Sequence, residues 1–262
     1  MPASPLRLTE ARREAVQAAD KLSHVVFWLK RRRPRAEAPR LRPRVAATEL
    51  ARVDFTELVP DPLPFLGQAA SLQLAFFESL AKAVATSPDL VSKEGLSVAS
   101  GEALAKHHAL IEELRRADAE PAEYLAMFAA ATDHFRQLTS SADWHELLLG
   151  IHLTSGMLDD FFLRLSDGLP VELGRRVRGI LGDRQGAPVL EQLLTQAIAN
   201  EPGLADRLAL WGRSLVGDTL LVARKALEAA EPEARHGEDV EPVFTELIAE
   251  HTRRMDALGL TA

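Results

Sequence analysis

Five histidines in the middle of the chain are candidates for a metal-binding or catalytic site, because imidazole binds metal ions and transfers protons near neutral pH. They are His107, His108, His134, His145 and His152. His145 and His152 are seven residues apart, which places them on nearly one face of a helix. No HExxH pair, paired zinc motif or calcium loop accompanies them. The sequence therefore favours partly exposed or hydrogen-bonded histidines over a new metal site.

Other catalytic chemistries have less support in the sequence. The chain contains no cysteine, which excludes disulfides, thiolate metal ligands and cysteine nucleophiles. Gly-rich phosphate loops are absent, and Ser155 lacks the strand–turn–helix context of a hydrolase nucleophile. Trp144 and Trp211 are expected to anchor a core, with Gly212 and Gly217 allowing close helix packing.

The elements that would position these residues are helices. The composition is 47% hydrophobic but only 5% aromatic, which suits helices packing on helices better than a β-rich core. We predict an all-α fold, an antiparallel four-helix bundle with extra short helices. The expected helices cover residues 65–85, 96–117, 121–138, 143–165, 171–181, 188–199, 203–230 and 240–257.

The first part of the chain differs from the rest in charge. Residues 1–60 hold 13 Lys or Arg against 7 Asp or Glu, whereas the whole chain has a net charge of −7. A first helix is expected before residues 30–44, whose prolines and eight basic residues predict an extended linker that trypsin cleaves early. The expected division is a basic N-terminal arm, residues 1–60, and a helical domain, residues 61–262.

The basic arm has several interpretations. It could fold against the acidic body or a neighbouring subunit, bind nucleic-acid phosphates, or lie on a membrane surface beside Phe27 and Trp28. No secretory signal or membrane span is visible, so a cytoplasmic location is expected. The cations that would make such contacts are Lys30, Arg31, Arg32, Arg33, Arg35, Arg40, Arg42 and Arg44.

Three blocks resemble a known family. They are DWHELLLGIHLTSGMLDD (143–160), RLALWGRSLVGD (207–218) and AEHTRRMDALGL (249–260). In this order and spacing they resemble bacterial ferritin-like proteins related to the tRNA (methylthio-isopentenyl-adenosine) hydroxylase MiaE. The resemblance covers roughly residues 65–260 and implies a ferritin-like bundle. In such a bundle, carboxylates and histidines from four helices bind two metal ions.

The resemblance places non-ligand residues at the metal positions of the first two helices. The family's Tyr-Gly-Glu-Leu, followed by Ala-Phe, corresponds to ASLQLAF, with Leu72 at the Glu. The family's Glu-Phe-Gly-His places Ala103 and Lys106 at the Glu and His. A shift by one residue would place Glu102 and Ala105 there, still without the histidine.

The other two helices show the same kind of change. The Asp of a Gly-Asp-Gly stretch on the third helix corresponds to Ser155. Asp-Thr-Gly-His on the fourth becomes DRQG, with Gly186 at the His. The acidic positions shared with the family are Glu146, Asp160 and Asp183. The resemblance therefore implies that most metal ligands are replaced, and we expect no metal or other cofactor.

The first hypothesis for function is a non-catalytic ferritin-like scaffold or binding protein that has lost its di-iron centre. Apolar substitutions are consistent with it, because buried charges without a metal are costly. A protein partner or a homo-oligomer is expected, and the bundle interior could bind a small apolar ligand. The alternatives are a MiaE-like metal-dependent oxygenase with an altered ligand set, and an adaptor that works through the basic arm.

Overall fold

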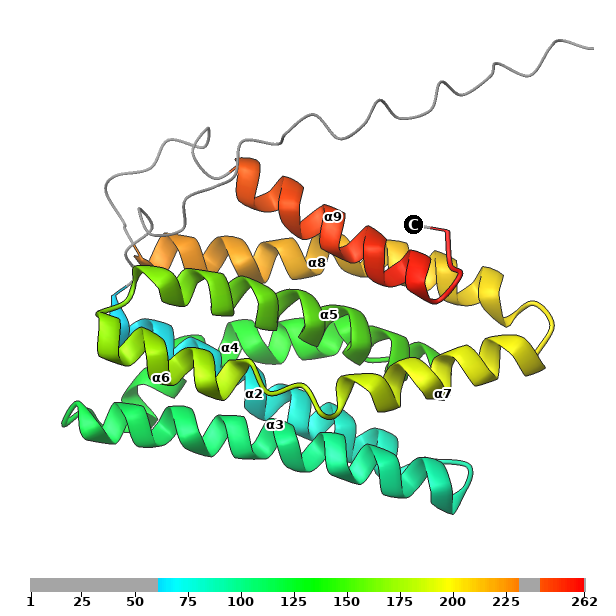
Figure 1. The fold of residues 1–262 in the computed structure, drawn as a ribbon, viewed down its shortest axis with the longest axis horizontal. Coiled ribbons are helices and arrows are strands. Elements are labelled where there is room, and N and C mark those ends of the chain that lie inside the picture. The colour runs from blue at the N-terminus through cyan, green and yellow to red at the C-terminus, as the bar shows by residue number, and fades with distance from the viewer. Residues whose placement is uncertain (1–60, 231–240, 262) are drawn as a thin grey trace, which may run out of the picture. The chain divides into compact units, whose positions relative to one another are not determined.

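The computed structural model describes residues 61–230 and 241–261, which belong to one compact unit, Ala51–Ala262. These residues form eight α-helices and one short 3₁₀ helix and contain no strand, so the predicted all-α fold is confirmed (Figure 1). The elements are α2 (Pro62–Ala85), α3 (Leu90–Arg116), α4 (Pro121–Thr139), α5 (Trp144–Leu165), η2 (Ser166–Gly168), α6 (Val171–Leu181), α7 (Ala187–Asn200), α8 (Leu204–Ala230) and α9 (Glu241–Ala257).

The helices form two adjoining groups that share α2 and α5. In the first group, α2 packs on α3 and α5, and both α3 and α5 pack on α6 and α7. Helices α6 and α7 follow one another along the bundle, interrupted at residues 182–186, and act as one broken helix (Figure 1). In the second group, α4 packs on α2 and α8, and α8 packs on α5. Helix α9 covers α5 and α8.

The helix boundaries follow the sequence closely, with one clear correction. Helix α3 begins at Leu90, whereas the apolar periodicity predicted a start near Leu96. Asp89 caps the true start, since its carboxylate accepts hydrogen bonds from the Ser92 amide (2.9 Å) and hydroxyl (2.7 Å). Leu90 and Val91 are each 81% exposed, so the first turn shows no buried apolar face for a periodicity argument to detect.

The predicted core anchors are confirmed. The indole Nε1 of Trp144 donates to a backbone carbonyl of α2 (3.0 Å), and that of Trp211 donates to a backbone carbonyl of α5 (2.9 Å). Gly212 permits close packing of α8 on α9, because a Cβ there would lie 2.5 Å from the Met255 sulfur. The same expectation is wrong for Gly217, where a Cβ would meet nothing within 4 Å. The Trp144, Trp211 and Gly212 contacts fix the positions of α2, α5, α8 and α9 relative to one another.

The expectations for the arm concern residues that the structure does not describe. Residues 1–60, including the linker at 30–44 and its eight cations, lie outside the described ranges. Within residues 61–230 and 241–261, no helix is both long and apolar enough to cross a membrane.

Candidate functional site

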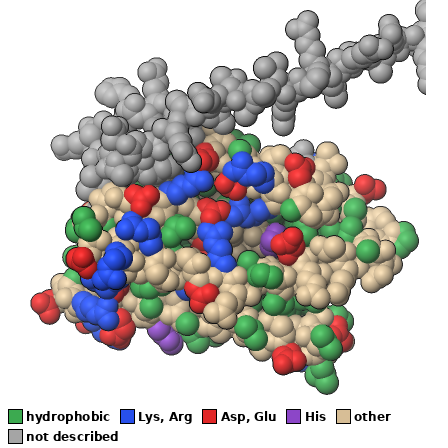
Figure 2. Space-filling view, viewed as in Figure 1, with side chains coloured by type: hydrophobic (Ala, Val, Ile, Leu, Met, Phe, Trp, Pro, Cys, Tyr) green, Lys and Arg blue, Asp and Glu red, His purple; other side chains and the backbone are tan. Residues whose placement is uncertain are grey.

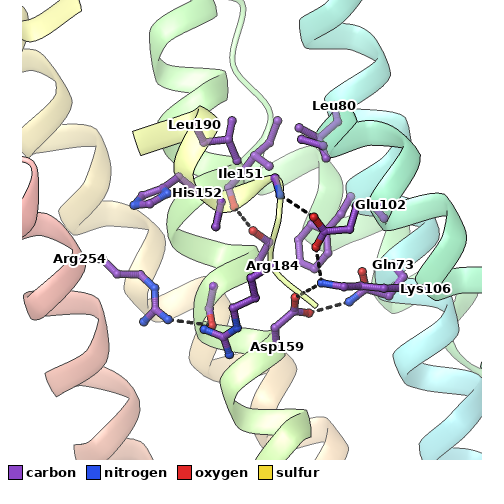
Figure 3. A pocket seen from close by; sticks show the side chains of 17 residues that line it. Gln73, Leu80, Glu102, Lys106, Ile151, His152, Asp159, Arg184, Leu190 and Arg254 are labelled. Carbon is purple, nitrogen blue, oxygen red and sulfur yellow. Dashed lines mark hydrogen bonds and ion pairs between the residues drawn. The ribbon is translucent and has the colours of Figure 1, made fainter. Parts of the chain in front are cut away.

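A small polar cavity of about 90 Å³ lies inside the first helix group, beside the interruption between α6 and α7 (Figure 3). Helix α6 ends at Leu181, and α7 begins at Ala187 with a proline in its first turn. The residues between them place Arg184 and Gly186 against the cavity. The polar side chains that line it are Gln73, Glu102, Lys106, His152, Ser155, Asp159, Arg184 and Arg254.

Lys106 lies at the centre of the polar contacts. Its ammonium Nζ is 2.8 Å from Glu102 Oε1 and 3.1 Å from Asp159 Oδ2. Gln73 Nε2 donates to the other oxygen of Asp159 (2.6 Å), and the Gly186 amide donates to the other oxygen of Glu102 (2.5 Å). One cation therefore joins carboxylates from α3 and α5 and satisfies much of their hydrogen-bonding capacity.

Burial and charge pairing act in opposite directions on this cluster. Burial disfavours the charged form of Lys106, but Asp159 and Glu102 outweigh it and place the pKa of Lys106 above its ordinary value. Burial also raises the pKa of Asp159, against the stabilising effect of Lys106 and Gln73. Lys106 is therefore the main group that favours the charged form of Asp159 against the effect of burial on its pKa.

A second ion cluster adjoins the cavity and connects the interruption to the last helix. Asp160 accepts hydrogen bonds from Arg184 and from Arg254 of α9. Burial opposes the charged form of Asp160, but the hydrogen bonds from the two arginines lower its pKa below the ordinary value. Arg254 also donates to the Gly156 carbonyl oxygen (3.1 Å). The cluster therefore binds α5 to α9 and to residues 182–186.

His152 is the histidine that lines this cavity. Burial, with a further contribution from the Arg254 cation, lowers its pKa to about 4. The imidazole is therefore neutral at neutral pH. The other central histidines lie elsewhere: His107 Nδ1 is 2.9 Å from the Ala70 carbonyl oxygen, and the His145 ring packs edge-on against Trp144. These positions agree with the expectation of partly exposed or hydrogen-bonded histidines.

The resemblance places five residues of this chain at positions where the family has metal ligands, and four of the five lie together in the structure. Ala103, Lys106, Ser155 and Gly186 all line the cavity. Leu72 is buried, at 2% exposure, as expected, but it lines a different cavity between α2, α4 and α8. Successive residues of a helix point about 100° apart, so the neighbouring Gln73 is the residue of α2 that faces Asp159.

The three retained acids are not gathered at the cavity. Glu146 lies in the first turn of α5, where its amide donates to the capping Asp143 (3.0 Å) and its carboxylate accepts from the Ser141 hydroxyl (2.6 Å). Asp160 lies beside the cavity in the arginine cluster, and Asp183 is exposed between α6 and α7. An alternative site built on these three carboxylates is therefore not supported by their positions.

Sequence reasoning missed the central acid, Asp159. A usable signal was present, because His152, Ser155 and Asp159 follow the i, i+3, i+7 spacing of one helical face. The neighbouring Asp160 was preferred because it matched the family. Arg184 and Arg254 had no comparable signal, since their roles depend on contacts between distant segments.

The residues present do not fit a di-iron centre. No group of three or more His, Cys, Asp or Glu residues within residues 61–230 and 241–261 is arranged to hold a metal ion. Two iron ions require several anionic ligands and imidazoles in defined tautomers. The cavity offers two carboxylates that share the Lys106 ammonium, and a third carboxylate beside it is bound to two arginines.

The surface near the cavity carries both signs of charge. Figure 2 shows arginines with acidic side chains between them on the face formed by α5, α6 and α9. For example, Arg164 pairs with Glu246, and Arg178 pairs with Asp167 at 2.7 Å. This face is therefore a network of ion pairs rather than a uniformly basic patch.

The fold and the position of the site define a ferritin-like helical bundle with a polar cavity at its centre. A family model described as a ferritin-like domain of actinomycetes matches residues 38–232, and the chain belongs to this family. The match begins within the predicted arm and ends before α9. A comparison with curated proteins found no match.

Proposed function

We propose that this chain is a non-catalytic ferritin-like scaffold or binding protein in which Lys106 takes the place of a metal centre. The observation that carries the proposal is the position of the Lys106 ammonium, within 3.1 Å of carboxylates from two helices of the bundle. In a metal-binding relative, those helices would direct their carboxylates at a metal ion. Here a side-chain cation holds them together.

The charges of the cluster support this interpretation. A metal ion entering between Glu102 and Asp159 would have to displace a lysine whose charged form these same carboxylates stabilise. Gln73 offers a neutral amide where a third carboxylate would be needed. The resemblance to MiaE-related proteins suggests that the cluster replaces an ancestral di-metal site, and this descent is part of the proposal.

Metal content tests the proposal directly. The full chain, produced with excess iron or manganese and washed with a chelator, is expected to retain well below one metal ion per chain. Elemental analysis measures this, and an oxygen-dependent hydroxylation assay is expected to show no turnover. Stoichiometric metal after the wash would overturn the proposal and favour the alternative of a metal-dependent oxygenase.

A designed variant provides the positive control. Combining Gln73→Glu, Lys106→His and Ser155→Asp would add two carboxylates and an imidazole around Glu102 and Asp159. This variant is expected to bind metal that the wild type does not retain, with lower stability when metal-free because buried charges are then unpaired. Lys106→Met alone is the matched control, because it removes the ammonium without adding a ligand. If Lys106→Met bound metal as well as the triple variant, the added ligands would have no role.

A further inference from the structure

A second cavity lies in the other helix group, between α2, α4 and α8. It has a volume of about 190 Å³ and is separate from the polar cavity around Lys106. Its apolar walls include the aromatic rings of Phe128 and Phe135. The remaining apolar side chains that line it are Leu72, Ala131, Leu138, Leu221 and Val222.

Thr132, His134, Asp218 and Gln68 are the polar residues that line this cavity, and Gln68 is the buried one among them. Gln68 lies on α2 and is 5% exposed, yet its amide makes no hydrogen bond within the described part of the chain. The amide is not fully enclosed, because no fully buried side-chain nitrogen or oxygen atom among the described residues lacks a partner. An amide with free hydrogen-bonding capacity beside the cavity can donate to or accept from a molecule bound there.

We propose that this cavity binds a small apolar molecule that carries one uncharged hydrogen-bonding group. A cavity of 150 Å³ with apolar walls holds benzene, so about 190 Å³ suits a single substituted ring. The Gln68 amide both donates and accepts, which matches a hydroxyl or an amide group. No Lys or Arg lines the cavity, and the carboxylate of Asp218, which lines it together with Thr132 and His134, would repel an anion.

This inference does not depend on the proposed loss of the metal centre. The two cavities lie on different sides of α2, which directs Gln73 to one and Gln68 and Leu72 to the other. Metal content and ligand binding are separate measurements, so failure of one leaves the other unaffected.

Two probes of equal size test the inference on the full-length chain. p-Cresol carries a hydroxyl where p-xylene carries a methyl group, and both can be titrated by calorimetry or ligand-observed NMR. Both are expected to bind, with p-cresol about fivefold tighter, the factor that corresponds to one ordinary hydrogen bond. If neither probe binds up to its solubility limit, the inference is overturned.

Substitutions locate the site. Gln68→Leu is expected to remove the preference for p-cresol while p-xylene still binds. Ala131→Phe would fill the cavity and weaken both probes at least about tenfold, as loss of a well-packed ring predicts. Ala130→Phe on the exposed face of the same helix is the matched control and should leave both affinities unchanged.

Three results would contradict the assignment. If Gln68→Leu retained the preference for p-cresol, the hydrogen-bonding role of the amide would be wrong. If Ala130→Phe weakened binding as much as Ala131→Phe, the probes would bind elsewhere. If Ala131→Phe changed the oligomeric state and neither probe bound, the cavity would be an interface between two copies of the chain.

Discussion

Lys106→Met removes the central cation of the polar cavity and nearly preserves the volume of the side chain. Lys106 is 6% exposed, and it lies 2.8 Å from Glu102 and 3.1 Å from Asp159. In the variant, the nearest remaining partner of Glu102 is the Gly186 amide, and that of Asp159 is the Gln73 side-chain amide. Removing one partner of a buried ion pair costs about 3–5 kcal/mol, and we expect a loss of this size in the free energy of unfolding at pH 7.5.

The loss should depend on pH in a defined direction. Burial already raises the pKa of Asp159, and without Lys106 that pKa should rise further. The folded state then binds a proton more strongly than the unfolded state does, so stability increases as the pH falls through the raised pKa. Urea unfolding followed by circular dichroism at pH 7.5 and pH 5 should show a smaller difference from wild type at the lower pH.

Two controls make this test specific. Adding Asp159→Asn to Lys106→Met removes the unpaired charge and should recover most of the lost stability at pH 7.5. Lys93→Met changes a more accessible lysine of the same helix and should alter stability by less than about 0.5 kcal/mol. A loss below about 1 kcal/mol for Lys106→Met, or an equal loss at both pH values, would refute the argument that Lys106 keeps Asp159 charged.

Two further predictions concern the same cavity. Gly186→Ala should lower stability by about 1–3 kcal/mol, because the new Cβ would lie 2.7 Å from the Ala99 Cβ. Gly101→Ala, where a Cβ meets nothing within 4 Å, should instead be neutral or stabilising, and urea unfolding compares the two variants. His152 should titrate by NMR with a midpoint of about 4, and Arg254→Met should raise that midpoint. Because the folded pKa of His152 lies below 6.5, its contribution to stability should be lost as the pH falls from 6.5 towards 4, and a midpoint near 6.5 would contradict its burial.

The helices could be predicted well because their apolar residues repeat at helical spacing and their ends carry caps and prolines. The start of α3 was the exception, since Leu90 and Val91 are exposed. The site was harder to predict on α2, where a difference of one residue decides which cavity a side chain faces. Leu72 and Gln73 are adjacent in the sequence, but they line different cavities.

Only one ion pair of the site could be predicted from local spacing in the sequence. Glu102 and Lys106 are four residues apart on one helix, a spacing that predicts their contact. The contact of Lys106 with Asp159, however, joins helices 53 residues apart in sequence, and that of Asp160 with Arg254 spans 94 residues. Such pairs depend on how the helices pack, which local spacing does not determine.

The family match and the folded unit end at different places in the chain, and α9 lies in the part that the match does not cover. The family match ends at residue 232, but Arg254 holds Asp160, Met255 fills the space above Gly212, and His251 lies 2.8 Å from the Gly212 carbonyl oxygen. A chain cut at residue 232 would therefore expose apolar surface on α5 and α8 and leave Asp160 with one arginine. The matched segment therefore lacks the helix that completes the packing of α5 and α8, and a domain transplanted from this chain should carry α9 with it.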